Sequence, residues 1–170
     1  MAVLAQLEPK AVFRYFEEIC GIPHGSSDTQ AISDYLVAFA KKRNLYVRQD
    51  TLGNVIMKKP ATRGYEDLPV VMIQGHMDMV CEKTDDKEID FHTQGLDLVL
   101  DENVIHADRT TLGGDDGIAV AFALAILDAD DIPHPALEVV ITVDEEIGML
   151  GAAGITTEDL HASYMLNLDS

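Results

Sequence analysis

Several residues that can bind metal ions stand directly after apolar segments of the sequence. His76 and Asp78 follow the segment Val70–Gln74, with a single residue between them. Two later apolar segments end in the same way: Asp144, Glu145 and Glu146 follow one, and Asp169 follows the other. A glycine-rich turn carries a further pair, Asp115 and Asp116. One imidazole among several carboxylates suits zinc, manganese or cobalt better than calcium, which prefers oxygen ligands alone. The pattern therefore predicts a transition-metal site.

These side chains need a common meeting point and a compensating charge. In open α/β sheets, ligands bind in the crevice outside the carboxyl ends of the strands, so residues that follow strands converge there. Carboxylates brought together raise each other's pKa, and a bound cation relieves that repulsion. Two metal ions that share one carboxylate use such a ligand set more fully than one ion does.

The remaining sequence supplies the elements that position the site. Apolar residues three and four positions apart predict a helix over Pro9–Cys20 and a second helix across Ile32–Ala40. Ser26 or Ser27 would be the N-cap of the second helix. A buried helix is expected over Gly117–Leu127, which is apolar almost all round. Apolar or alternating segments predict strands at Tyr46–Gln49, Asn54–Lys58, Pro69–Gln74, Leu98–Leu100, Val104–Ala107, Leu137–Val143 and Tyr164–Leu168.

The order of these elements favours an α/β fold with a central, mostly parallel sheet flanked by helices. Pro69–Gln74 is apolar on both faces, which predicts a central strand in a sheet covered on both sides. The sequence stops at Ser170, directly after an apolar strand and a candidate ligand. We therefore expect a chain that is cut rather than one that ends naturally.

Each candidate cluster also has an ordinary structural explanation when it is taken alone. Asp115 and Asp116 could cap the buried helix, and Glu145-Glu146 could be a solvated strand end. A single histidine is usually a satisfied polar residue. The conjunction of the clusters at strand ends is what favours a metal site. The other histidines show no such pattern: we expect surface positions for His92, His106, His134 and His161, and leave His24 open.

The overall charge excludes several classes of partner. The formal net charge is −18, with 30 acidic residues against 12 lysines and arginines. Such a surface repels nucleic acid and anionic membranes. No apolar run approaches the roughly 20 residues that span a bilayer, and residues 1–10 lack the pattern of a signal peptide. Because the cysteines are limited to Cys20 and Cys81, we expect a reducing, cytoplasmic setting.

Four motifs resemble those of the co-catalytic zinc dipeptidases. They occur in the family's order at suitable spacing, and the resemblance covers essentially the whole chain: Gly75-His76-Met77-Asp78-Met79-Val80, Thr110-Thr111-Leu112-Gly113-Gly114-Asp115-Asp116-Gly117, Asp144-Glu145-Glu146-Ile147-Gly148-Met149 and Asn167-Leu168-Asp169-Ser170. The resemblance implies metal-dependent hydrolysis of dipeptides, Xaa-His dipeptides among them, with two zinc ions in a complete site. Manganese or cobalt are expected substitutes for zinc.

The resemblance also implies roles for individual residues. It assigns His76 and Asp169 to the first zinc. Asp115 would be shared by both ions, and Glu146 would bind the second zinc. Asp78 would bond the far nitrogen of His76 and fix its tautomer. Glu145 would be the general base, taking a proton from the metal-activated water and passing it to the leaving amine. Asp116 receives no ligand role.

The resemblance implies that residues 1–170 are the truncated, N-terminal part of the family's catalytic domain. The sequence departs from the family in what it lacks. No residue matches the family's late histidine ligand of the second zinc, and the inserted domain that closes over substrate and mediates dimerisation is absent. We therefore expect the complete protein to be a homodimer through that absent domain. For this chain alone we expect at most one firmly held metal ion and no useful peptidase activity. Missing strands should also leave an apolar sheet edge that favours association.

Three rival functions remain open at the level of sequence. An aminoacylase, carboxypeptidase or deacylase of the same superfamily would share these ligands. A non-catalytic peptide-binding module would keep the fold, although the presence of Glu145 and of every ligand expected in this span argues against it. A calcium-binding domain is disfavoured by His76 and by the absence of an EF-hand loop.

Overall fold

The computed structural model describes residues 2–169, and in that range it has four helices and seven strands. The helices are α1 (Lys10–Cys20), α2 (Gln30–Lys42), α3 (Gly114–Asp128) and α4 (Leu150–Gly154). The strands are β1 (Tyr46–Gln49), β2 (Val55–Lys59), β3 (Val71–His76), β4 (Leu98–Asp101), β5 (Val104–Ala107), β6 (Leu137–Thr142) and β7 (Tyr164–Asn167). Every helix and strand that the sequence predicts is therefore present, and α4 is additional.

One sheet carries the strands that end near the candidate site. Its strand order is β1-β2-β6-β3-β7. β3 is parallel to both β6 and β7, whereas β2 is antiparallel to both β1 and β6. The sheet is therefore mixed: β2 opposes the direction shared by the other strands named here. The carboxyl ends of β6, β3 and β7 lie at the same edge, as the expectation of a largely parallel sheet requires.

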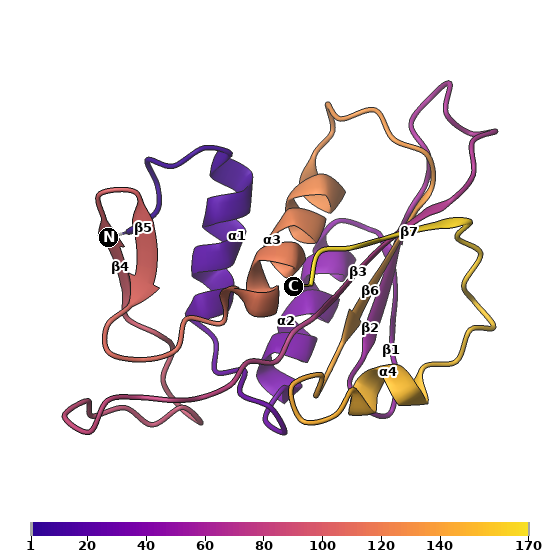
Figure 1. Cartoon of the computed structure of the whole chain (residues 1–170). Helices are drawn as coiled ribbons and strands as arrows, with labels where there is room; N and C mark the ends of the chain where they lie inside the picture. The colour runs from indigo at the N-terminus through magenta and orange to yellow at the C-terminus, as the bar shows by residue number, and fades with distance from the viewer. Residues whose placement is uncertain (1, 170) are drawn as a thin grey trace.

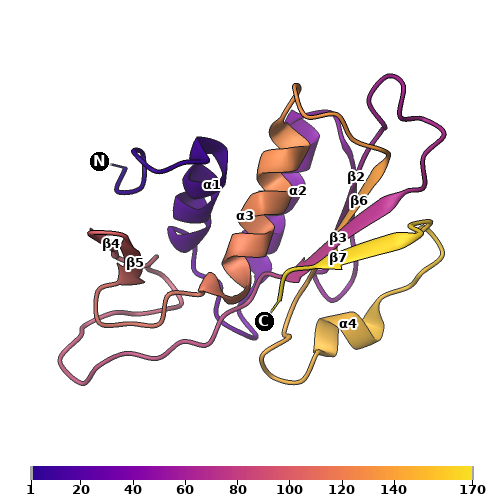
Figure 2. The same cartoon turned by 45° about the horizontal axis from the view of Figure 1, so that its top comes forward.

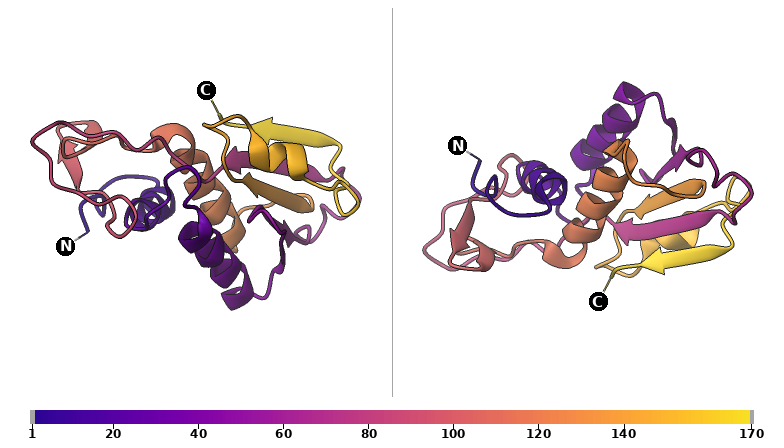
Figure 3. Two further views of the ribbon diagram at one scale, coloured as in Figure 1. Left: turned by 90° about the horizontal axis from the view of Figure 1, so that it is seen from below. Right: turned by 90° about the horizontal axis from the view of Figure 1, so that it is seen from above.

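The helices cover the sheet on both sides. α2 and α3 lie on one side, and α4 with the segment after it lies on the other (Figure 1). α3 packs between β3 and α1, so that two further views show α1 outside α3 (Figure 3). This position explains why α3 is apolar on nearly all sides, since both of its faces are covered. Its buried residues join those of α1, α2 and the sheet in one hydrophobic core.

The starts of two helices differ from the sequence prediction, whereas the expected central strand is confirmed. α2 begins at Gln30 with Thr29 at the N-cap position, so neither Ser26 nor Ser27 is its cap. β3 lies between β6 and β7, as expected of a central strand, and its neighbour β6 is buried along its whole length. α3 begins at Gly114, three residues before Gly117, and its first turn is kinked at Asp115 and Asp116, whose backbone angles are not helical. Within residues 2–169, no helix is long and apolar enough to cross a membrane.

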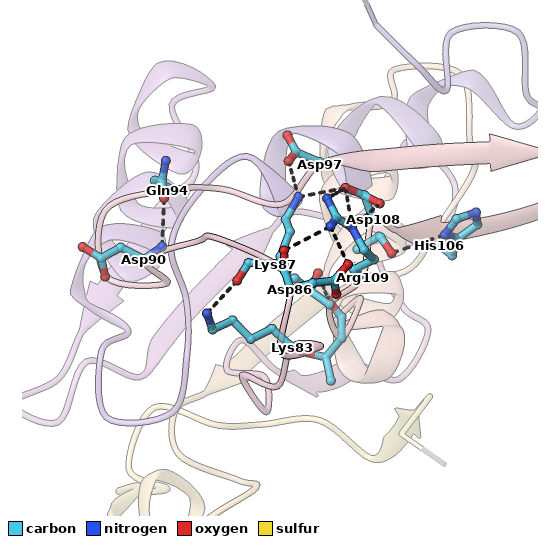
Figure 4. Close-up of polar contacts among 12 residues, drawn as sticks. Lys83, Asp86, Lys87, Asp90, Gln94, Asp97, His106, Asp108 and Arg109 are labelled. Atoms are coloured by element: carbon cyan, nitrogen blue, oxygen red, sulfur yellow. Dashed lines mark hydrogen bonds and ion pairs between the residues drawn. The ribbon is translucent and has the colours of Figure 1, made fainter.

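The acidic loop between β3 and β4 is held against the β4–β5 hairpin. Lys87 is 5% exposed, and its Nζ lies 2.7 Å from Asp97 Oδ2 and 3.0 Å from Asp108 Oδ2. Arg109 pairs with Asp108 and also reaches Asp86 in the loop (Figure 4). Two carboxylates compensate the buried ammonium group, so this cluster has a structural explanation.

Candidate metal centre

Three elements bring one histidine and two aspartates together. His76 ends β3, Asp115 lies in the first turn of α3, and Asp169 follows β7. Each of the three offers one ligand atom, and these atoms all lie within 4.8 Å of one another. The parallel pairing of β3 with β7 explains the approach, because it puts both strand ends at one edge. In Figure 2 the chain beyond β7 passes beside the start of α3.

The two ring nitrogens of His76 face different surroundings. The ring is 1% exposed, and its Nε2 lies 3.3 Å from Asp115 Oδ1. Nδ1 lies 3.0 Å from the backbone oxygen of Asp78 and 3.4 Å from the carboxylate oxygen Oδ1 of the same residue. A proton on Nδ1 would be shared with Asp78, leaving the Nε2 lone pair directed at the aspartates. This is the tautomer that a metal ligand needs.

Asp78 connects His76 to the segment that carries the two glutamates. Its Oδ1 accepts a hydrogen bond of 3.0 Å from the Glu145 backbone N–H, and its Oδ2 accepts one of 3.4 Å from that of Glu146. The Ser26 hydroxyl donates to Oδ2 at 2.8 Å. Burial raises the pKa of Asp78, but hydrogen bonds from His76, the Glu145 N–H and Ser26 outweigh burial, so the pKa is lowered. The buried carboxylate is therefore charged and fixed in place.

Glu145 and Glu146 lie next to the three-residue group without belonging to it. In the part of the chain that is described, the group of atoms within 4.8 Å holds neither glutamate. The Glu146 side chain still interacts with the site electrostatically. Partial burial raises its pKa and the charge of His76 opposes this, but the nearby carboxylates of Asp115, Glu145 and Asp78 keep the pKa raised. The geometry therefore puts both glutamates at the same edge as the three-residue group.

Asp116, to which the family resemblance assigns no ligand role, is a buried carboxylate next to His76. It is 1% exposed, and its Oδ2 accepts a 3.1 Å hydrogen bond from the His76 backbone N–H. Its Oδ1 is buried without a hydrogen-bond partner among the described residues. Burial raises the pKa of Asp116 to about 6. The doubled aspartate is the signal in the sequence, which predicts either a metal-site cluster or a helix cap; α3 has no side-chain cap bond.

The donor set fits a metal ion. Burial lowers the pKa of His76. The hydrogen bond and charge of Asp78, then the charge of Asp116 and the hydrogen bond of Asp115, overcome burial and raise this pKa to about 9. The negative field that holds a proton there would equally attract a cation. An imidazole with two carboxylates is a set that zinc, manganese or cobalt accepts. His76, Asp115 and Asp169 are thus the residues that could hold the ion.

Two other histidines are buried. His134 is 5% exposed, so the prediction that it lies at the surface is wrong; its backbone N–H and C=O both bond Thr62, which holds it against the protein. His24 is 3% exposed, its Nδ1 lies 2.6 Å from the Ile22 oxygen, and burial lowers its pKa. Neither residue joins the metal-binding group.

Comparisons with known proteins agree with this arrangement. No protein-family model matches the chain. The chain is 39% identical over 170 residues to the cytosol non-specific dipeptidase of Escherichia coli. The aligned region covers 100% of this chain and 35% of that protein. The crystal structure of the aminoacylhistidine dipeptidase from Vibrio alginolyticus superposes with a TM-score of 0.95 at 40% identity, over 98% of this chain and 34% of that one.

A tripeptidase structure from Staphylococcus aureus shares the fold, with a TM-score of 0.79 at 24% identity over 95% of this chain and 43% of that one. The chain spans about a third of the length of the two dipeptidases. Its mixed α/β architecture, with a central sheet flanked by helices, is the one found in these peptidases. Over its whole length, the chain is therefore similar in sequence and fold to one third of the cytosol non-specific and aminoacylhistidine dipeptidases.

Proposed function

We propose that this chain is the N-terminal part of the catalytic domain of a metal-dependent dipeptidase. The observation that carries the proposal is the group formed by His76, Asp115 and Asp169, whose ligand atoms lie within 4.8 Å of one another. The 39% identity to a protein named a cytosol non-specific dipeptidase supports the choice of substrate class. The substrates are dipeptides, Xaa-His dipeptides among them.

The chain's own residues divide the work as follows. His76, Asp115 and Asp169 would hold the first metal ion, and Asp115 and Glu146 would hold a second. A bound zinc ion supplies a Lewis acid that activates water and polarises the scissile carbonyl. Asp78 keeps His76 in the tautomer with a free Nε2. Glu145 takes a proton from the attacking water and returns it to the leaving amine.

The complete site holds two zinc ions, with manganese or cobalt as substitutes. Glu146 stands at the same sheet edge as the three-residue group, which supports a second ion there, and Asp115 is exposed enough to face both. The protein acts in the cytoplasm, as its relative's name and the two free thiols of Cys20 and Cys81 suggest. We propose a homodimer for the complete protein, formed through a second, inserted domain.

A chimera tests the proposed reaction. The segment of the E. coli dipeptidase that aligns with this chain is replaced by the present sequence, and hydrolysis of a dipeptide panel is measured. The proposal predicts hydrolysis by the chimera. In the chimera, Glu145→Gln should lower kcat by about 10²- to 10⁴-fold, because general-base catalysis contributes that much. Glu158→Gln, at an exposed position, is the control and should leave kcat unchanged.

Two outcomes would contradict the proposal. A folded, metal-loaded chimera that cleaves acylated amino acids but no dipeptide would favour an aminoacylase or deacylase. A folded, metal-loaded chimera that binds dipeptides without cleaving them would favour a peptide-binding module. The similarity to the dipeptidases extends over the whole chain, which favours a dipeptidase over both rivals.

A further inference from the structure

The loop between α1 and α2 is bonded to the segments that leave β3 and β6. The Met79 N–H donates to the His24 carbonyl at 3.1 Å, and the Ser26 N–H donates to the Met79 carbonyl at the same distance. The Ser27 N–H donates to Asp144 Oδ1 at 2.6 Å. Residues 24–27 therefore join the strand end that carries His76 to the strand end that carries Glu145, two segments far apart in sequence.

One side chain of this loop reaches into the candidate centre. The Ser26 hydroxyl has one proton, and its nearest acceptor is Asp78 Oδ2 at 2.8 Å, compared with 3.4 Å for the Met79 carbonyl. The acceptor is a charged carboxylate that is 1% exposed. Hydrogen bonds to charged groups are among the stronger ones in proteins, so this contact restrains both partners. The sequence assigned Ser26 to helix capping, which the structure excludes because α2 begins at Gln30.

We propose that Ser26 is a positioning residue of the metal centre, acting through Asp78. The terminal torsion of an aspartate is broad, so a carboxylate is not fixed by its own rotamer preference. With Oδ2 held by Ser26, Oδ1 stays 3.0 Å from the Glu145 N–H and 3.4 Å from His76 Nδ1. The hydroxyl thus orients the imidazole and the segment of the proposed base together. The effect on metal binding rests on the proposed function, whereas the contact between Ser26 and Asp78 does not.

The contact is tested first in the metal-free chain by amide hydrogen exchange. Ser26→Ala removes the donor, so the Glu145 N–H should exchange about 10-fold faster as its acceptor becomes mobile. Ser26→Thr keeps a hydroxyl and should restore slow exchange. Ser27→Ala is the matched control: it removes a neighbouring hydroxyl but keeps the backbone N–H that bonds Asp144. Exchange of the Val140 N–H, in the buried middle strand β6, reports whether each variant remains folded.

Ser26→Cys provides a second variant of similar size with a weak donor, and it decides the matter if Ser26→Ala does not fold. Fast exchange at Glu145 in the alanine or cysteine variant, with slow exchange in the threonine variant, supports the proposal. Unchanged exchange at Glu145 in a folded alanine or cysteine variant overturns it, and so does an equal effect of Ser27→Ala.

A cobalt(II) titration followed by visible absorption then tests the consequence. Ser26→Ala should bind cobalt about 10-fold more weakly than the unaltered chain, with an altered ligand-field spectrum, and Ser26→Thr should recover both. Equal affinity and an equal spectrum in the alanine variant would overturn the link to the metal. If the unaltered chain takes up no cobalt, the proposed metal centre fails, whereas the exchange experiment still decides whether Ser26 holds Asp78.

Discussion

At the scale of single residues, the site depends on Gly75, which lets β3 approach the start of α3 closely next to His76. A Cβ atom on Gly75 would lie 2.5 Å from Asp116 Oδ2 and 3.2 Å from the Ala119 Cβ. Both neighbours belong to α3, so the glycine permits the close approach of β3 to that helix. The same approach lets the Asp116 carboxylate reach the His76 backbone N–H.

Gly75→Ala should therefore destabilise the protein. Overpacking of a buried contact costs about 1 to 3 kcal/mol, and here the displaced atom is a buried carboxylate oxygen. Urea unfolding measures the change. Gly114→Ala is the control, because its Cβ would meet only the Leu112 side chain at an ordinary 3.7 Å. Equal stability of the two variants would show that α3 moves away at no cost.

At the scale of elements, Asp128 joins three helices at the end of α3. Its Oδ2 accepts from the Tyr15 hydroxyl at 2.6 Å and from Arg14 at 2.9 Å, and its Oδ1 accepts from Arg43 at 2.5 Å. The hydrogen bond from Arg43 lowers the pKa of Asp128, and partial burial opposes it. With the further hydrogen bonds from Tyr15 and Arg14, the pKa falls to about 2. Asp128 thus fixes α1 and α2 to the helix that supplies Asp115.

Asp128→Asn should lower stability at pH 7 by about 1 kcal/mol, since the carboxylate is partly solvated and screened. A carboxylate with a depressed folded-state pKa stabilises the protein above its unfolded pKa, near 4, and loses that effect as pH falls towards 2. The difference between variant and unaltered chain should therefore shrink from pH 4 downwards. Urea unfolding at several pH values checks this, with the exposed Asp131→Asn as control. A constant difference down to pH 2 would contradict the account.

Much of this element level could be predicted from sequence. Apolar residues three and four positions apart predict α1 and α2, and a continuous apolar segment predicts the buried α3. Apolar or alternating segments predict the strands. These patterns appear in the sequence because each element buries one or both of its faces. The roles of Ser26 and Asp116 could not be predicted. Serine and aspartate near a helix start indicate caps locally, whereas their actual partners, Asp78 and His76, are 52 and 40 residues away. Burial of His134 was missed for the same reason, since Thr62 is 72 residues distant.

At the scale of the whole molecule, β7 is an exposed edge of the described sheet. Tyr164, Met165 and Leu166 are 63%, 62% and 55% exposed, and Leu168 beyond the strand is 49% exposed. An edge strand with unpaired backbone groups and apolar side chains is a template for pairing with another chain. The sequence expectation of an apolar sheet edge is thus met by the structure, whereas association itself stays a prediction.

We expect the 170-residue chain to self-associate through β7 as its concentration rises. Leu166→Lys puts a charge on that edge and should shift the sedimentation profile towards monomer. Val104→Lys is the matched control, because Val104 is 62% exposed on β5, which belongs to the other sheet. If both variants associate as strongly as the unaltered chain, the β7 edge is not the contact surface.

The central claim is that strand ends far apart in sequence build a metal centre around His76. A calorimetric zinc titration of the chain tests it most directly, beside His76→Ala and the control His92→Ala at an exposed histidine. The account predicts one firmly held ion, at least about 100-fold weaker binding in His76→Ala, and unchanged binding in His92→Ala. Zinc binding that is equally tight in His76→Ala would contradict the account.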